Sequence, residues 1–339
     1  MAIYWKDSLN FASKLSFKRA INLAKVYASY FVSKWRKKAV HWGLPFAIAI
    51  EPTTSCNLRC PECPSGLRAF TRPTGMLEPD GFKKVIDQIM DRLLYLTFYF
   101  QGEPYLNPHF FELIRYASDR KIYTATSTNA HFLTKEKAHK TIESGLDRLI
   151  ISIDGTTQEV YEQYRRGGKL NKVIEGTKNI VAAKKAAGKG PHLIFQFLVV
   201  KPNEHQIEDV KVLAKELGVD EVKFKTAQVY EYKNGNPLIP TIEKYSRYAL
   251  EKDGTYSLKN KLSNECWKMW HSCVVSWDGK IVPCCFDKDA SHSMGDLKKE
   301  AFEDIWQGST YKKFREQILL SRSQIDICKN CTEGTKVWA

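Results

Sequence analysis

From residue 46 onward, short apolar runs alternate with longer segments whose apolar residues recur at helical spacing. The short runs predict β-strands, and the longer segments predict amphipathic helices. We expect strands at residues 46–51, 95–100, 122–128, 149–154, 193–200 and 221–226. Helices are expected at 80–91, 108–119, 135–144 and 207–217, with two more ending near Ala187. This alternation favours an α/β fold with one parallel sheet, curled or open, over residues 46–227.

After residue 227 the pattern changes. Residues 228–262 are polar and interrupted by glycine and proline, which is typical of a bridging segment. Asp278-Gly279 then separates two short apolar runs, 274–277 and 280–283, and predicts a hairpin with a two-residue turn. A single helix is expected at 301–320. We therefore expect a small, cysteine-bearing domain over residues 263–339.

Residues 1–45 read as a basic, amphipathic helical segment. They hold nine Lys or Arg and one acidic residue, so +8 of the net charge of +14 lies there. Apolar residues recur at helical spacing at Ile21, Ala24, Ala28, Phe31 and Trp35, and the basic residues Lys18, Arg19, Lys25, Arg36 and Lys37 fall on the opposite side. Three interpretations compete: a helix packed on the main domain, a helix lying on an anionic membrane surface, and a helix that docks a partner. Packing is the commonest use of an apolar stripe, so we expect it here.

The composition narrows the class of protein. With 339 residues, 43% of them hydrophobic, the chain can bury a sizeable core. No apolar run has transmembrane length, and the first ten residues lack the pattern of a secretory signal, so we expect a cytoplasmic protein. In a reducing compartment, nine cysteines favour metal binding over a disulfide framework. Outside residues 1–45 the charge excess is small and no nucleic-acid-binding motif occurs, which argues against nucleic acid as a partner.

Three cysteines, Cys56, Cys60 and Cys63, follow the first predicted strand in a Cys-x3-Cys-x2-Cys pattern. Thiolates so close in sequence can hold three irons of a cubane cluster and leave the fourth iron open to a ligand. The alternatives are three unrelated buried cysteines or a zinc knuckle without its fourth ligand.

This pattern resembles the signature of the radical S-adenosylmethionine (SAM) superfamily, and the resemblance extends from about residue 45 to residue 226. It implies a partial (β/α)6, TIM-like barrel and a [4Fe-4S] cluster whose open iron binds SAM. It also implies reductive cleavage of SAM to a 5′-deoxyadenosyl radical that takes hydrogen from a substrate, with an electron donor such as flavodoxin or ferredoxin. One position departs from the family: Glu62 precedes the third cysteine, where an aromatic residue is usual.

Polar residues mark the carboxyl ends of the predicted strands, where chemistry collects in barrels. They are Gln101-Gly102-Glu103-Pro104 after the second strand, Ser127 and Asn129 at the third, and Ser152 and Asp154 at the fourth. The first group resembles the Gly-Gly-Glu motif that binds the SAM amino group, with Gln101 in place of the first glycine. The resemblance further implies ribose and carboxylate contacts from the residues of the other two strands, and a SAM-carboxylate contact from Arg165. It assigns no general base.

Six more cysteines lie near the C-terminal end. Cys266, Cys284, Cys328 and Cys331 offer four thiolates and no open position, which suits either a [4Fe-4S] cluster or structural zinc. With Trp277-Asp278-Gly279 and Met294-Gly295-Asp296-Leu297, they resemble the twitch domain, the one-cluster form of the SPASM extension of radical SAM enzymes. That resemblance implies one auxiliary [4Fe-4S] cluster and selects Cys284 over Cys285. For Cys273 we expect buried packing, with a ligand role in place of Cys266 or a hydrogen-atom donor as alternatives.

The leading hypothesis is a radical SAM oxidoreductase or maturase that modifies a peptide or protein side chain. Dehydrogenation or another radical modification of a small sugar-like or lipid substrate is the alternative within the same class. A hypothesis of another class is a basic iron–sulfur protein that binds RNA or a membrane without catalysis. Formation of 5′-deoxyadenosine under reducing conditions separates the enzymes from the binding protein.

Overall fold

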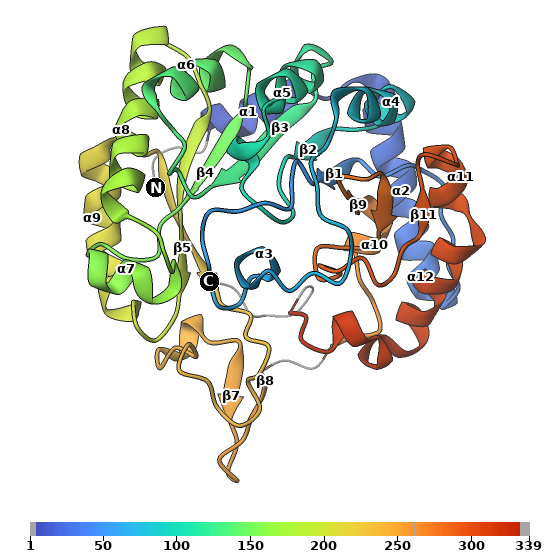
Figure 1. Ribbon diagram of the computed structural model, residues 1–339. Helices are drawn as coiled ribbons and strands as arrows, with labels where there is room; N and C mark the ends of the chain where they lie inside the picture. The colour runs from blue at the N-terminus through green and yellow to red at the C-terminus, as the bar shows by residue number, and fades with distance from the viewer. Residues whose placement is uncertain (1–4, 260–261, 333–339) are drawn as a thin grey trace.

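The computed structural model describes residues 5–259 and 262–332. In this part of the chain a nine-stranded sheet has the order β11-β10-β9-β1-β2-β3-β4-β5-β6, and it curves around the loop that holds α3 (Pro64–Leu67) (Figure 1). Strands β1 to β6 are parallel to one another. The predicted α/β fold with a partial barrel is confirmed.

The barrel strands lie close to their predicted positions. They are β1 (Ala47–Ile50), β2 (Tyr95–Thr97), β3 (Tyr123–Thr128), β4 (Arg148–Ser152), β5 (His192–Val199) and β6 (Glu221–Thr226). The helices of the barrel are α4 (Pro79–Ile89), α5 (Phe110–Asp119), α6 (Lys135–Glu143), α7 (Gln158–Tyr164), α8 (Leu170–Ala187) and α9 (Ile207–Leu217), with short 3-10 turns η1 (Pro104–Leu106) and η2 (Glu204–Gln206). Because parallel strands cannot be joined by tight turns, these helices supply the crossover connections.

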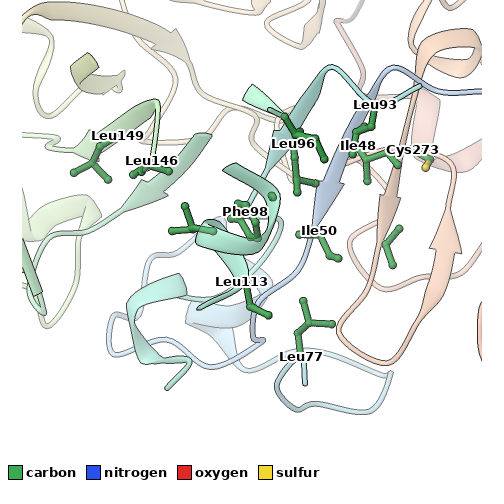
Figure 2. Close-up of a cluster of buried hydrophobic side chains, with 14 of the residues drawn as sticks. Ile48, Ile50, Leu77, Leu93, Leu96, Phe98, Leu113, Leu146, Leu149 and Cys273 are labelled. Carbon is green, nitrogen blue, oxygen red and sulfur yellow. The ribbon is translucent and has the colours of Figure 1, made fainter. Parts of the chain in front are cut away.

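The hydrophobic core spans the barrel and the C-terminal strands. Ile48 of β1 pairs with Leu96 of β2 on one side and with Cys273 of β9 (Ser272–Val275) on the other. All three side chains are buried in one cluster (Figure 2). Cys273 is thus a packing residue of the core, as expected.

The C-terminal residues extend the barrel sheet rather than forming a separate layer. β9 runs parallel to β1, and β10 (Lys280–Val282) and β11 (Gly295–Asp296) follow in antiparallel order. The hairpin at Asp278-Gly279 is present, but the prediction of a two-residue turn was wrong: Ser276 donates its N–H to Lys280 at 2.9 Å, which leaves three residues in the loop. Gly279, at φ +88°, takes the left-handed position that a three-residue hairpin loop requires.

One further expectation is corrected. The helix predicted at 301–320 is two helices, α11 (Phe302–Gln307) and α12 (Ser309–Ser321), because the chain turns into extended conformation at Gly308. The bridging segment is partly ordered: it contains η3 (Glu243–Tyr245) and an antiparallel hairpin of β7 (Tyr248–Leu250) and β8 (Tyr256–Leu258), which projects from the barrel (Figure 1). The remaining short elements are α10 (Lys268–His271), η4 (Arg322–Gln324) and η5 (Asp326–Cys328).

The N-terminal segment forms α1 (Trp5–Ser13) and α2 (Phe17–Arg36). Both helices pack on the main body, but α2 does so with the side opposite to the one expected. Its buried residues are Arg19, Asn22, Val26, Ser29 and Ser33, whereas Ile21, Phe31 and Trp35 of the apolar stripe are exposed. Amphipathic spacing identifies a helix and its two faces, and tertiary contacts decide which face turns inward.

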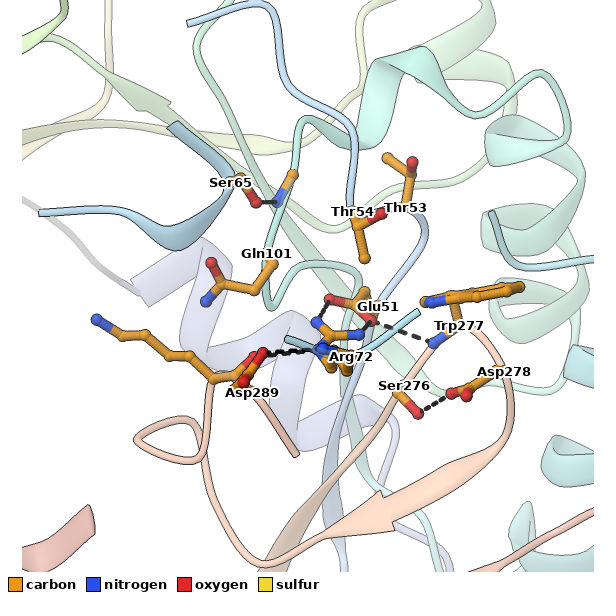
Figure 3. Close-up of polar contacts among 12 residues, drawn as sticks. Glu51, Thr53, Thr54, Ser65, Arg72, Gln101, Ser276, Trp277, Asp278 and Asp289 are labelled. Atoms are coloured by element: carbon orange, nitrogen blue, oxygen red, sulfur yellow. Dashed lines mark hydrogen bonds and ion pairs between the residues drawn. The ribbon is translucent and has the colours of Figure 1, made fainter. Parts of the chain in front are cut away.

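A buried ion pair joins the end of β1 to the loop after the first cysteine group, and hydrogen bonds connect both to the C-terminal residues (Figure 3). The Arg72 guanidinium donates two hydrogen bonds to the Glu51 carboxylate, at 2.9 and 2.6 Å. Glu51 also accepts the N–H of Trp277 at 3.3 Å, and the Thr71 N–H donates to Asp289 at 2.9 Å. These contacts hold the loop after the first cysteine group against the C-terminal residues.

We predict that Glu51→Gln lowers stability by about 3–5 kcal/mol, because it leaves a buried guanidinium without its counter-charge. The matched control is Glu112→Gln, which breaks the exposed pair with Lys83 and is expected to cost less than about 1 kcal/mol. Thermal unfolding of the metal-loaded protein gives the comparison. Equal melting temperatures for the two variants would contradict the structural role of the Glu51–Arg72 pair.

Candidate functional site

The first cysteine group lies in the loop between β1 and α3. Gly66 in α3 has no room for a side chain: a Cβ there would lie 2.5 Å from the Cys60 nitrogen and 2.6 Å from its oxygen. The loop therefore folds tightly back on Cys60. This fold brings Cys56, Cys60 and Cys63 to the wall of one cavity of about 220 Å3.

The three cysteines lie around one cavity, as the ligands of a cluster must. Among the described residues, no group of three or more His, Cys, Asp or Glu converges on a point that would hold one metal ion. A cubane distributes its thiolates over separate irons, so its ligands need only surround a common cavity. The cavity, with three thiols on its wall, fits that arrangement.

Polar groups from the barrel surround the sulfurs. Asn129 Nδ2 lies 3.9 Å from the Cys56 sulfur, Arg165 Nη1 lies 3.9 Å from the Cys60 sulfur, and the Cys63 thiol lies 3.9 Å from Gln101 Oε1. Burial raises the pKa of the Cys56 thiol to about 12. A metal cluster must therefore displace protons when it binds, and N–H donors beside the sulfurs favour the thiolate form.

Glu103 places a buried carboxylate in the same cavity. It accepts hydrogen bonds from Thr128 Oγ1 at 2.7 Å, the Asn129 N–H at 2.8 Å and the Tyr105 N–H at 3.3 Å. Burial raises the pKa of Glu103, and these donors oppose that shift. A carboxylate has about four acceptor positions, so one remains for a ligand. An ammonium group would supply that hydrogen bond and add opposite charge beside the carboxylate.

Gly102 lets the strand end approach the cysteine loop closely. It has φ +72°, and a Cβ on it would lie 2.2 Å from the Thr53 oxygen. Its N–H donates to Ser65 Oγ at 2.9 Å, and the next N–H, of Glu103, donates to the Ser55 oxygen at 2.8 Å. Glycine is the residue that fits here, because it alone adopts this backbone conformation without a side-chain clash.

Arg165 also lines the cavity, and Asp154 holds it there. The Asp154 carboxylate is fully buried and accepts from Arg165 Nε and from the Leu198 N–H at 2.7 Å. Asp154 itself does not line the cavity, so the expected direct contact with SAM is not supported by its position. It orients the guanidinium, whose remaining N–H groups are available to an anion.

The other residues expected at this site do lie there. Ser127 and Ser152 line the cavity with hydroxyl oxygens 3.4 Å apart. Sequence reasoning assigned no role to seven further residues on the same wall: Leu58, Ser65, Gly66, Tyr99, Phe100, Thr128 and Tyr164. Tyr99 and Phe100 directly precede the Gln101-Gly102-Glu103 motif, a proximity that could have pointed to them.

Glu62 occupies the position that departs from the family pattern. Its side chain accepts the N–H of Tyr230 at 3.0 Å. Tyr230 in turn receives a hydrogen bond from Lys288 at 2.8 Å. The carboxylate therefore ties the cysteine loop to the segment that follows β6.

The second cysteine group surrounds a small, closed pocket. Cys266, Cys284, Cys328 and Cys331 line it together with Arg322, whose Nη2 lies 3.3 Å from the Cys331 sulfur. Burial raises the pKa of Cys266 to about 11, and the nearby guanidinium opposes that shift. Four thiols and a cation suit a cluster of net negative charge.

The two remaining cysteines lie off this pocket. Cys285 is exposed, with Lys268 Nζ 3.7 Å from its sulfur. Cys273 is in the core on β9, next to Tyr311, and does not line the pocket. Its position supports Cys266 over Cys273 as a proposed fourth ligand.

Comparison with known protein families shows that each cysteine group lies in a range of the chain that matches a family model. The radical SAM superfamily matches residues 50–217, and an iron–sulfur cluster-binding domain, SPASM, matches residues 266–332. PqqA peptide cyclase of Bradyrhizobium diazoefficiens is 25% identical over 328 residues, covering 88% of this chain and 82% of the relative. AdoMet-dependent heme synthase of Methanosarcina barkeri is 27% identical over 322 residues, covering 84% and 88%.

A solved structure shows the same fold. SuiB of Streptococcus suis, bound to S-adenosylmethionine, superposes with a TM-score of 0.64 at 16% identity, over 90% of this chain and 75% of SuiB. The first cysteine group lies in the region that matches the radical SAM superfamily, and the second lies in the region that matches SPASM. The chain thus belongs to the radical SAM superfamily and carries a SPASM iron–sulfur cluster-binding domain after its barrel.

Proposed function

We propose that this protein is a radical SAM maturase that modifies a side chain of a peptide or protein. The observation that carries the proposal is one cavity that joins three thiols, a buried carboxylate and an oriented guanidinium. Cys56, Cys60 and Cys63 would hold the SAM-binding [4Fe-4S] cluster. When bound, the reduced cluster and SAM supply a 5′-deoxyadenosyl radical that takes a hydrogen atom from the substrate.

The polar residues of the cavity would bind and orient SAM. Glu103 has a buried carboxylate with one free acceptor position, which suits the amino group. Arg165, held by Asp154, has free N–H donors that suit the carboxylate. Ser127 and Ser152 present hydroxyls 3.4 Å apart, a spacing at which both can contact a ribose hydroxyl. Tyr99, Phe100 and Tyr164 cover part of the wall and limit access of water.

The second cysteine group would hold one auxiliary [4Fe-4S] cluster, with Cys266, Cys284, Cys328 and Cys331 as ligands. Four thiols leave no position open, which favours a role in electron transfer from the substrate radical over substrate binding. The sheet that carries Cys284 is continuous with the barrel through β9 and β1, so the two sites keep a fixed separation.

The peptide substrate is supported by the relative named PqqA peptide cyclase. A small-molecule substrate is the second candidate, because another relative of similar identity is named a heme synthase. Anaerobic incubation with reductant, SAM and candidate peptides tests the proposal. A peptide whose mass changes with formation of 5′-deoxyadenosine supports it, whereas turnover of small molecules alone would favour the second candidate.

We predict that Cys56→Ala, Cys60→Ala and Cys63→Ala each abolish formation of 5′-deoxyadenosine, because each removes an iron ligand. Iron content should fall from about eight to about four atoms per chain if two cubanes are bound. Cys273→Ala, at a cysteine of the core, is the control and should keep both iron and activity. Unchanged SAM cleavage in the three variants would exclude this cysteine group as the cluster site.

We predict that Glu103→Gln weakens SAM binding about 10-fold to 100-fold, because the amide keeps the shape but loses the charge that pairs with an ammonium. In the wild-type protein, SAM affinity should fall at acid pH, and at a higher pH than an ordinary glutamate would give, because burial raises the pKa of Glu103. The Glu103→Gln variant should not show this loss of SAM affinity at acid pH. Equilibrium binding of SAM across pH measures both effects, and Glu136→Gln on exposed α6 serves as the control.

We predict that Cys328→Ala removes the auxiliary cluster and leaves SAM cleavage measurable while product formation falls. Metal analysis of the wild-type protein shows whether the second cysteine group binds an iron–sulfur cluster or zinc. About eight irons and no zinc indicate two cubanes, whereas about four irons and one zinc would assign the second group to structural zinc.

A further inference from the structure

The inward face of α2 is mostly polar, and its buried side chains Arg19 and Asn22 are hydrogen-bonded to the main chain of neighbouring segments. The Arg19 guanidinium donates to four main-chain carbonyl oxygens, those of Lys14, Met90, Arg120 and Lys121. Asn22 pairs with the main chain of Leu44 in both directions at 2.9 Å. Because these buried groups have their partners only in this orientation, the helix cannot turn its other face inward at low cost.

The outward face of α2 is a continuous apolar row. It consists of Phe17, Ile21, Ala24, Ala28, Phe31 and Trp35. At about 100° per residue, these side chains occupy roughly 80° of the helix surface, opposite the buried residues, along about 27 Å. Phe17, Phe31 and Trp35 are 80%, 59% and 82% exposed. Large contiguous apolar surfaces on folded proteins mark interaction sites.

Unpaired basic residues accompany the row. Lys25 lies on one flank of α2, and Arg36, Lys37 and Lys38 follow at its C-terminal end. None of these four side chains makes a hydrogen bond or ion pair with the described residues. Lys34, on the other flank, already pairs with Glu265. The surface therefore combines bulky apolar side chains with four basic side chains that form no ion pair with the described residues.

We propose that α2 is a docking surface for a membrane of anionic phospholipids. The row is a convex ridge, which sinks into a deformable headgroup layer, whereas a folded partner would need a matching groove. Trp35 beside Arg36, Lys37 and Lys38 suits the boundary between acyl chains and charged headgroups. The helix lies on the surface rather than across it, since no helix of the described residues is long and apolar enough to span a membrane.

The charge and the apolar row contribute separately to binding. Each basic residue near an anionic surface strengthens binding about fivefold at low ionic strength, and salt screens this part. Burial of the apolar row in the boundary region is independent of salt. Wild-type binding should therefore weaken, but persist in part, when the salt concentration rises.

Flotation of the metal-loaded protein with vesicles tests the proposal. We expect it to float with vesicles of phosphatidylcholine containing about one-third phosphatidylserine, and far less with phosphatidylcholine alone. Phe17→Ser/Phe31→Ser/Trp35→Ser should lower binding at least tenfold with an unchanged melting temperature, because the three side chains are exposed. Lys25→Glu/Lys37→Glu/Lys38→Glu should remove most of the preference for anionic vesicles.

The matched control removes equally exposed apolar side chains elsewhere. Val212→Ser on α9 and Leu320→Ser on α12 should leave flotation at the wild-type level. Three results would overturn the proposal: no flotation of the wild-type protein, equal flotation of the triple serine variant, or equal binding to neutral and anionic vesicles. A dimer in sedimentation that the serine variant abolishes, without flotation, would assign the face to a second copy of the chain and equally overturn it.

Discussion

β1 is hydrogen-bonded to a neighbouring strand on both of its edges, and the arrangement of both cysteine groups depends on that pairing. On one edge it pairs with β2, which leads to Glu103, and on the other it pairs with β9, which leads through β10 to Cys284. Its own end carries Glu51 and then the cysteine loop. A single sheet therefore fixes the first cysteine loop, the strand ends that line its cavity and the second cysteine pocket relative to one another. The buried Glu51–Arg72 pair closes the same junction from the loop side.

Parallel strands explain why so much of the site could be predicted. Their carboxyl ends meet at one edge, so Glu103, Ser127 and Ser152 come together although they are far apart in sequence. The alternation of side chains along a strand does not determine the path of the backbone beyond the strand end. Asp154 is an example of a residue whose position could not be predicted for this reason. It lies just beyond β4 and turns to bind Arg165 and the N–H of Leu198, a support role that spacing alone does not reveal. The aromatic wall of Tyr99 and Phe100 was missed because apolar residues at a strand end look like core.

The fold was predictable where local pattern and tertiary packing agree, as in β6 and α9. The fold was not predictable where the backbone conformation of a single residue determines the course of the chain. Gly308 ends a helix although the helical spacing of apolar residues continues beyond it. Gly279 takes the left-handed conformation of a three-residue hairpin loop, whereas the Asp-Gly sequence predicts a two-residue loop. The continuity of the C-terminal strands with the barrel sheet was also hidden, because strand pairing between residues 47–50 and 272–275 leaves no local signal.

The N-terminal segment shows how a polar anchor can orient an apolar surface. At the amino-terminal end of the barrel strands, Asp7 of α1 binds Tyr123 and Arg148, and Phe11 packs edge-on against Tyr123 at 5.3 Å. Near the other end of the segment, Tyr30 of α2 packs edge-on against Trp267 and Trp270 of the C-terminal region. Arg19 of α2 is bonded to the main chain of the barrel at Met90 and Arg120, so α2 contacts both parts of the molecule. Because the opposite face of α2 is anchored, its apolar row cannot turn away from water. The row therefore stays exposed unless a binding partner covers it.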